Sequence, residues 1–202
     1  MLGKDWVPGF GVIHTWFAID INGCLAMMVN NGFGGLPSQL LRVDQVEVLL
    51  DKMNEFVWEE SAEYVEYPQN KGGSFEVDLY SAFMWRKFSS REEVHGRLQE
   101  ELLRRGRFAD ANVAKNKGFY VYHAVEGSFP GDDYPVGHIG ESKMGDYYRF
   151  MVPSVLGSIN DFPSELRKGV AVSTSVDFSV DRLLPSDRIS ELFPCLYFCS
   201  LS

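Results

Sequence analysis

The sequence predicts an α+β fold with a mostly antiparallel sheet and two principal helices. A hairpin signal stands near the N-terminus, two segments with helical character follow, and from Gly118 onward short apolar runs alternate with Pro and Gly. Strands and helices separated in this way are typical of α+β folds. With 202 residues and 45% apolar side chains, the chain can bury a sizeable core. We expect one domain over residues 1–202, which divides, if at all, into halves at 1–117 and 118–202.

The segment HTWFAIDINGCLAMMV contains the clearest local signal. Two β-prone runs flank Asn22-Gly23, a pair that tolerates the positive φ angles of a two-residue hairpin turn. We therefore expect Thr15–Asp20 and Cys24–Val29 to form an antiparallel hairpin, with Asp20 at the strand end.

Two helices are expected next. The first covers Leu36–Glu60, with Pro37 near its first turn, where the missing N–H costs nothing. In the second, SSREEVHGRLQEELLRRG, Ser90 and Glu93 form a capping box and Gly106 ends the helix. Between the helices, YVEYPQNKGGSFEVDLYSAF predicts one or two short strands around its Lys-Gly-Gly turn. Further strands are expected in GFYVYHAVEG, DYYRFMVP, GVAVSTSVDFSV and CLYFCSL.

The loop NNGFGGLPSQ has the outline of a phosphate-binding loop because it joins a strand to a helix. It lacks the lysine and hydroxyl of a Walker loop and the G-x-G-x-x-G spacing, and Pro37 removes an N–H donor. The preceding strand also belongs to a hairpin rather than to a parallel βαβ unit. We interpret Gly32, Gly34 and Gly35 as a sharp corner, and no cofactor is expected.

Candidate metal ligands are His123, Glu126, His138 and the pair Asp132-Asp133. His123 and Glu126 are three residues apart, so in a strand they face opposite sides. The sequence contains no H-x-x-x-H or C-x-x-C pattern, and we therefore expect no metal site.

Nucleophilic catalysis would require an activated side chain. Cys24 beside His14 is the candidate, although a cysteine after a hairpin turn is usually a packing residue. Cys195 and Cys199 are interpreted as small core residues. Neither a G-x-S-x-G elbow nor Ser–His–Asp spacing occurs. The sequence therefore disfavours an enzyme.

The chain is acidic, with 28 acidic and 19 basic residues and a formal net charge of −9. Such a charge disfavours nucleic acid and anionic lipid and favours a basic partner. No apolar run approaches the length of a membrane span, and the N-terminus lacks the pattern of a signal peptide. The chain has three cysteines, and this odd number does not indicate a fold held together by disulfides. We expect a cytoplasmic protein with no membrane or nucleic-acid partner.

The segment RVDQVEVLLDKMNEFVWEE predicts an amphipathic helix with an acidic face. At about 100° per residue, the core stripe comprises Val43, Val46, Leu49, Leu50, Met53, Phe56 and Val57. The opposite face carries Asp44, Glu47, Asp51, Glu55 and Glu59, together with Val48 and Trp58.

This face is either a solvated surface of an acidic protein or a surface that receives a basic partner. Like charges at i+3 and i+4 destabilise a helix, so the row of acids has no evident structural benefit. Tryptophan often anchors interfaces, and surrounding charges raise the association rate. The predicted partner surface comprises Asp44, Glu47, Asp51, Glu55 and Trp58.

The hairpin and corner together, WFAIDINGCLAMMVNNGFGGLP, resemble an opening seen in small bacterial proteins. Many of those look like immunity proteins of polymorphic or contact-dependent toxin systems. The later segment DYYRFMVPS…LPSD is similar to their second half. The resemblance implies a cytoplasmic, toxin-neutralising role without catalytic residues. It is carried by Trp16, Ile19, Asp20, Gly23, Ala26, Gly32, Gly35 and Pro37.

The leading hypothesis is thus a binding protein that neutralises a basic toxin domain, such as a nuclease, by occluding it. The second hypothesis is a small enzyme or small-molecule-binding domain with a pocket among aromatic strands, formed by Tyr120, Tyr122, Tyr147, Tyr148 and Phe150. The third is a structural or scaffolding subunit.

Overall fold

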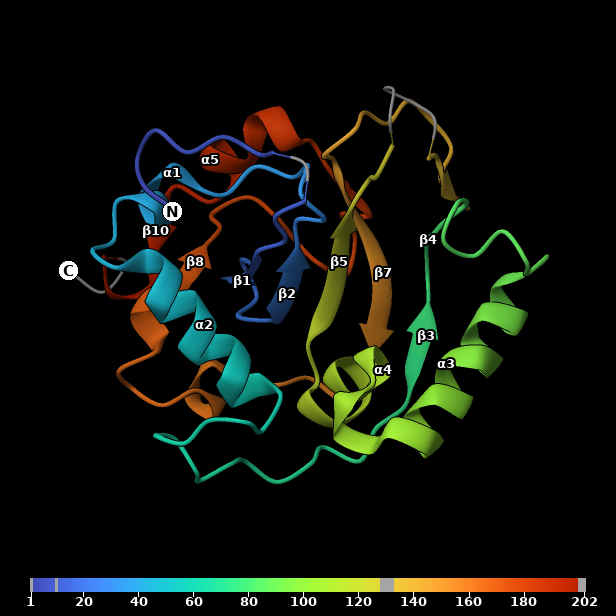
Figure 1. Ribbon diagram of the computed structural model, residues 1–202, viewed down its shortest axis with the longest axis horizontal. Coiled ribbons are helices and arrows are strands. Elements are labelled where there is room, and N and C mark those ends of the chain that lie inside the picture. The colour runs from blue at the N-terminus through green and yellow to red at the C-terminus, as the bar shows by residue number, and fades with distance from the viewer. Residues whose placement is uncertain (1, 10, 128–132, 200–202) are drawn as a thin grey trace.

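The computed structural model describes residues 2–9, 11–127 and 133–199 and confirms the α+β class. A mixed, mostly antiparallel sheet has the strand order β10-β8-β1-β2-β5-β7-β3, with β9 also paired to β7. The two longest helices of the described chain, α2 and α3, lie towards opposite ends of this sheet (Figure 1). None of the described helices is long and apolar enough to cross a membrane.

The strands are short, and those of the main sheet come from both halves of the chain. A second, two-stranded sheet pairs β4 with β6. The strands are β1 (Thr15–Ile19), β2 (Leu25–Val29), β3 (Phe75–Val77), β4 (Tyr80–Ser81), β5 (Tyr120–Ala124), β6 (Pro135–Val136), β7 (Tyr147–Pro153), β8 (Val170–Val172), β9 (Leu183–Leu184) and β10 (Cys195–Leu196).

The α-helices are likewise few and of unequal length. They are α1 (Ser38–Leu41), α2 (Val46–Val57), α3 (Arg91–Arg105), α4 (Asp110–Asn112) and α5 (Ile189–Leu192). A π-helical turn, η2 (Val113–Lys117), continues α4, and short 3-10 turns are η1 (Gly106–Phe108), η3 (Ile159–Asp161), η4 (Arg167–Gly169), η5 (Ser186–Arg188) and η6 (Tyr197–Cys199).

The predicted hairpin is confirmed, but its predicted two-residue turn is wrong. β1 and β2 pair in register from Thr15 opposite Val29 to Ile19 opposite Leu25. The Gly23 N–H donates to the Asp20 carbonyl and the Asp20 N–H to the Cys24 carbonyl, both at 3.1 Å. Gly23 has a φ of 79°, and it is the left-handed residue of a three-residue loop with a glycine bulge.

The carboxylate of Asp20 explains the longer loop. One of its oxygens accepts hydrogen bonds from the N–H groups of Asn22 at 2.9 Å and Cys24 at 2.8 Å. The other accepts from the N–H of Phe178 at 2.9 Å, although Phe178 is 158 residues away. Asp20 is 3% exposed, so this residue fixes the turn and attaches it to the C-terminal half.

Two parallel pairings organise the sheet. β1 pairs in parallel with β8, and β2 pairs in parallel with β5. The expectation that the strand before the glycine loop lies outside any parallel unit is therefore wrong. The connection from β2 to β5 contains the two principal helices, which is consistent with the long crossovers that parallel strands require.

The predicted helix over Leu36–Glu60 is wrong as one element. The chain forms α1, turns through residues 42–45 with a left-handed Gln45 (φ 53°), and restarts as α2. At 100° per residue, a continuous helix would hold Leu40 and Leu41 about 60–80° outside the apolar stripe of α2. The break allows both side chains to be buried.

The second helix is confirmed, with a modified cap. Ser90 is the N-cap, and its hydroxyl accepts from the Glu93 N–H at 3.2 Å. The Glu93 carboxylate bonds the N–H of Ser89 at 2.7 Å instead of completing a capping box with Ser90. Gly106, with a φ of 57°, ends the helix. Strands follow the Lys-Gly-Gly turn as β3 and β4, but none precedes it.

Tyr147 determines the shape of the glycine corner. A Cβ atom added to Gly34 would lie 2.5 Å from the Tyr147 ring. The Tyr147 hydroxyl accepts from the Trp16 indole Nε1 at 3.0 Å and donates to the Gly35 carbonyl at 2.9 Å. The backbone must therefore approach the ring closely, which only glycine permits at position 34.

We predict that Gly34→Ala lowers the free energy of unfolding by about 1–3 kcal/mol, because the new methyl group overpacks the fully buried Tyr147. Gly35→Ala is the matched control, since its Cβ would meet Ser186 at an ordinary 3.4 Å. Urea denaturation measures both variants. Equal losses at the two positions would contradict the proposed role of Tyr147.

Candidate functional site

The apolar stripe of α2 is confirmed. The residues Val46, Leu49, Leu50, Met53, Phe56 and Val57 are all buried. Val43, predicted to belong to the stripe, is half-buried because it lies in the turn before the helix. On the opposite face, Asp51 and Glu55 are exposed and Val48 is 50% exposed. The predicted acidic face therefore points to solvent over the middle of the helix.

Asp44 does not lie on the helix. It is exposed in the turn that precedes Gln45, and α2 begins only at Val46. The prediction of a helical Asp44 is wrong because the chain breaks between α1 and α2. The residue still stands beside the N-terminal end of α2.

The carboxylate of Glu47 already forms a hydrogen bond within the molecule. One oxygen of its carboxylate accepts from the Leu2 N–H at 3.1 Å, and the residue is half-buried. His14 lies close enough for the charges of Glu47 and Asp51 to favour its protonated form, although burial dominates and lowers the His14 pKa. The ring of His14 also contacts Trp6 edge-on, with centroids 5.5 Å apart. The N-terminal segment therefore covers part of the predicted face.

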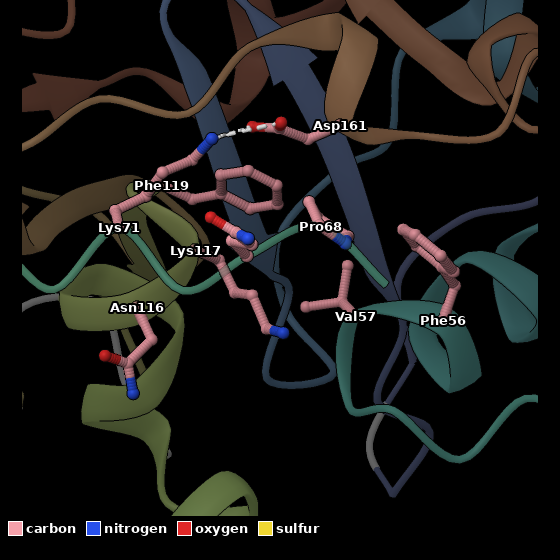
Figure 2. A pocket seen from close by; sticks show the side chains of 9 residues that line it. Phe56, Val57, Pro68, Lys71, Asn116, Lys117, Phe119 and Asp161 are labelled. Carbon is pink, nitrogen blue, oxygen red and sulfur yellow. Dashed lines mark hydrogen bonds and ion pairs between the residues drawn. The ribbon is translucent and has the colours of Figure 1, made fainter. Parts of the chain in front are cut away.

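Residues at the C-terminal end of α2 also contact other parts of the molecule. Trp58 is half-buried and packs against the core. Glu59 adopts a left-handed conformation, with a φ of 57°, and forms an ion pair with the buried Lys117. Figure 2 shows Lys117 extending towards Val57 at this end of the helix. Trp58 thus presents only part of its surface to a partner.

The acidic character continues beyond the helix. Residues 43–66 contain eight acids and one base, Lys52, which pairs with Glu63 at 2.6 Å. The Glu60 N–H bonds the Glu55 carbonyl, so Glu60 extends the same surface. We define the acidic surface as Asp44, Asp51, Glu55 and Glu60, which are exposed and form no side-chain hydrogen bond or ion pair with other described residues.

Glu60 was absent from the sequence-derived surface because a helix continued to this residue would place it on the apolar side, about 160° from Asp44. In the structure α2 ends at Val57, and Glu60 is exposed. The signal was nevertheless in the sequence, since the run of carboxylates continues through Glu60, Glu63 and Glu66 with no intervening base. Glu66 is exposed as well, on the segment that leads away from α2.

The glycine corner is confirmed as a corner. The N–H groups of Phe33 and Gly34 donate to the Asn30 carbonyl at 2.8 Å, and the Gly32 N–H donates to the Asn30 side chain at 3.1 Å. The Gly35 N–H donates to the Ser186 hydroxyl at 3.0 Å. These four consecutive donors are directed at the protein, whereas a phosphate-binding loop directs them at an anion.

Two of the candidate metal ligands, His123 and Asp133, have other contacts. His123 is buried against Phe150, with ring centroids 5.0 Å apart. Asp133 accepts from the Ser81 hydroxyl at 2.8 Å and the Phe83 N–H at 3.0 Å. Asp132 lies outside the described residues. Within the described residues, no group of three or more His, Cys, Asp or Glu side chains is arranged to hold a metal ion.

Cys24 and His14 lie at opposite ends of the β1–β2 hairpin. A five-residue strand spans about 16 Å, so they do not form a nucleophile–base pair. Burial and the neighbouring Asp20 raise the pKa of the Cys24 thiol to about 11, which disfavours the reactive thiolate. Cys195 is half-buried in β10 rather than a core residue. The Cys199 side chain lies outside the described part of the chain.

The five aromatic residues proposed to form a pocket are all buried. Tyr122, Tyr147, Tyr148 and Phe150 are 0–2% exposed and fill the core. Tyr120 lines a cleft of about 180 Å³, beside residues that include Asp78, Arg91 and Arg149. A smaller cavity between α2 and η2, with Phe56, Pro68 and Phe119 in its wall, has a volume of only about 10 Å³ (Figure 2).

Comparison with known proteins found no family model, no curated protein and no solved structure that matches the chain.

His123 should make stability depend on pH. Burial lowers its pKa, so below its ordinary value of 6.5 the unfolded chain binds a proton that the folded chain does not. We predict that the free energy of unfolding falls as the pH drops from 7 to 5, by at most about 1.4 kcal/mol per pH unit for this residue.

Urea denaturation of wild type and His123→Phe at pH 7, 6 and 5 tests this prediction. The variant should lose part of the slope, and His14 should still contribute to what remains because burial lowers its pKa in the same direction. An identical pH dependence in both proteins would show that His123 does not contribute.

Proposed function

We propose that this chain binds a basic protein partner through the acidic surface and neutralises that partner by occluding it. The observation that carries the proposal is the concentration of negative charge around α2. Residues 43–66 account for a net charge of −7, from eight acids and one base, out of −9 for the whole chain. A surface of this kind attracts a positively charged partner and accelerates its association.

The neighbouring carboxylates of α2 destabilise the helix, and no ion pair among the described residues neutralises them. Asp51 and Glu55 are neighbours at i,i+4, where like charges destabilise a helix by a few tenths of a kcal/mol. Lys52 follows Asp51 in sequence, but its ammonium group bonds Glu63 instead. A basic partner would supply the missing counter-charges, and this gives the destabilising arrangement a functional explanation.

The surface also offers apolar contact. Val48 is 50% exposed between Glu47 and the acids of the helix, and part of Trp58 remains accessible at the C-terminal end. Interfaces usually combine a few apolar or aromatic anchors with a charged periphery. The partner is therefore expected to place an apolar side chain among lysines or arginines.

The resemblance of the hairpin and corner to immunity proteins makes a toxin domain the expected partner, and a nuclease has the required chemistry. Nucleases bind the phosphate backbone with Lys and Arg, so an acidic protein surface can compete for the same side chains. The small-molecule alternative would use the cleft beside Tyr120. It is less favoured because the Arg149 guanidinium in that cleft is already bonded to Asp78 and Phe178.

The double variant Asp51→Lys, Glu55→Lys tests the electrostatic part of the proposal. We predict that it slows association at least about tenfold at low salt and weakens the salt dependence, because both effects arise from the local field. The free energy of unfolding should change by less than about 0.5 kcal/mol. The binding partner to use is the protein encoded immediately upstream of this chain's gene, with kinetics recorded by biolayer interferometry.

Glu100→Lys with Glu141→Lys is the control, since it makes the same charge change at exposed positions of α3 and of the loop before β7. Glu100 also loses its ion pair with Arg97, so the stability of this variant is measured in parallel. Co-expression with the upstream protein then measures protection of cell growth. Equal slowing by the two double variants would remove the acidic surface as the docking face. No binding by the wild type, or no protection of growth, would contradict toxin neutralisation.

Trp58→Ala should act on dissociation instead. If Trp58 anchors the partner, the loss of affinity should be about 2 kcal/mol, or a roughly thirtyfold faster dissociation. Because Trp58 also packs against the core, urea denaturation must be run in parallel. Trp85→Ala is the control, since Trp85 is likewise half-buried but packs against Phe88 and Phe150. A dissociation rate unchanged in Trp58→Ala would exclude it as an anchor.

A further inference from the structure

A second surface of the molecule has the opposite electrostatic character. An open groove of about 560 Å³ lies between the C-terminal end of α3 and the α4–η2 segment. Asn112, Lys115 and Arg107 contribute polar side chains to its wall, and Leu102 and Leu103 contribute apolar ones. This volume is within the range of small-molecule sites.

Asn112 is an unsatisfied donor in this wall. The residue is 3% exposed, and its Oδ1 accepts from the Asn116 Nδ2 at 2.7 Å. Its own Nδ2 has no hydrogen-bond partner among the described residues. A buried amide without an acceptor is costly, and such groups are few in folded proteins. Because this atom is itself buried, the Asn112 side chain would have to turn towards the groove for an acceptor bound there to complete its hydrogen bonding.

The charges around the groove favour an anion. Lys115 is half-buried and Arg107 is exposed, and neither forms an ion pair with another described residue. Glu59 also lines the groove, but Lys117 neutralises its carboxylate. Apart from Lys117, residues 102–117 carry one acid, Asp110, against four bases, which are Arg104, Arg105, Arg107 and Lys115.

The two lysines of the π-helical turn lie in different surroundings. In η2, Lys117 is buried and extends towards the C-terminal end of α2 (Figure 2), whereas Lys115 lines the groove. Single π turns are rare and frequently occur at functional sites. Here the turn directly follows Asn112, the residue with the unsatisfied amide.

We propose that this groove binds an oxyanion, a carboxylate or a phosphate, carried by a small molecule with an apolar part. The Asn112 amide donates to an oxygen of the anion, and Lys115 and Arg107 supply the positive charge. Leu102 and Leu103, the latter 89% exposed, contact the apolar part. Glu59 brings the groove next to the C-terminal end of the acidic surface, but the proposal does not depend on the toxin-neutralising function.

NMR titration of the full ¹⁵N-labelled chain tests the site. Sodium phosphate and sodium hexanoate are the two probes, and sodium chloride at matched ionic strength measures general screening. We expect saturable shifts of the Asn112 side-chain amide and of the backbone amides of 102–117. Lys115→Glu and Asn112→Leu should each weaken binding at least tenfold. Lys168→Glu, which reverses an exposed lysine outside the groove, should leave it unchanged.

The probes distinguish the two sources of the oxyanion. Binding of phosphate alone identifies a phosphate ligand, and binding of hexanoate alone identifies a carboxylate attached to an apolar chain. Shifts no larger than those in chloride would overturn the proposal. Equal binding by wild type and Lys115→Glu would also overturn it, even if Asn112→Leu fails to fold.

Discussion

The buried carboxylate of Asp78 joins three segments that the sheet alone would leave separate. It accepts from the Arg149 Nε at 2.7 Å, from the Arg182 Nη2 at 2.6 Å, and from the Arg182 Nε at 3.0 Å and 3.1 Å on its two oxygens. Arg149 also donates to the Phe178 carbonyl at 2.6 Å. The two arginines hold the pKa of Asp78 below its ordinary value, even though burial acts to raise it. Removing one partner of such a buried network is strongly destabilising.

The position of this network in the sheet explains why so much depends on it. One edge of β7 pairs first with β9 and then with β3, and Arg149 stands where the neighbour changes. Its N–H bonds the Arg182 carbonyl, and its carbonyl accepts from the Leu79 N–H. Both edge strands are very short, so side-chain charges supply the cohesion that a longer hydrogen-bonded ladder would otherwise provide.

Local chemistry made much of this fold predictable. Gly23 and Ser90 mark a turn and a helix start within a few residues, and the stripe of α2 follows directly from its periodicity. The break before α2 was not predictable in this way, because its left-handed residue is Gln45 rather than glycine. Within the site, periodicity placed Asp51 and Glu55 correctly. It could not show that Glu47 bonds Leu2 and that Glu59 bonds Lys117, because these partners are 45 and 58 residues away in the sequence.

The parallel pairing of β1 with β8 has a consequence for synthesis of the protein on the ribosome. Some 150 residues separate Phe17 from its partner Val170, so the hairpin emerges long before the strand that covers its edge. Until then, the backbone donors and acceptors along the β8-facing edge of β1 remain unpaired, as they do in any open sheet edge. Closing so distant a contact slows folding. The nascent chain therefore exposes an unpaired, aggregation-prone strand edge through most of its translation. A chaperone that shields the first thirty residues would cover this edge.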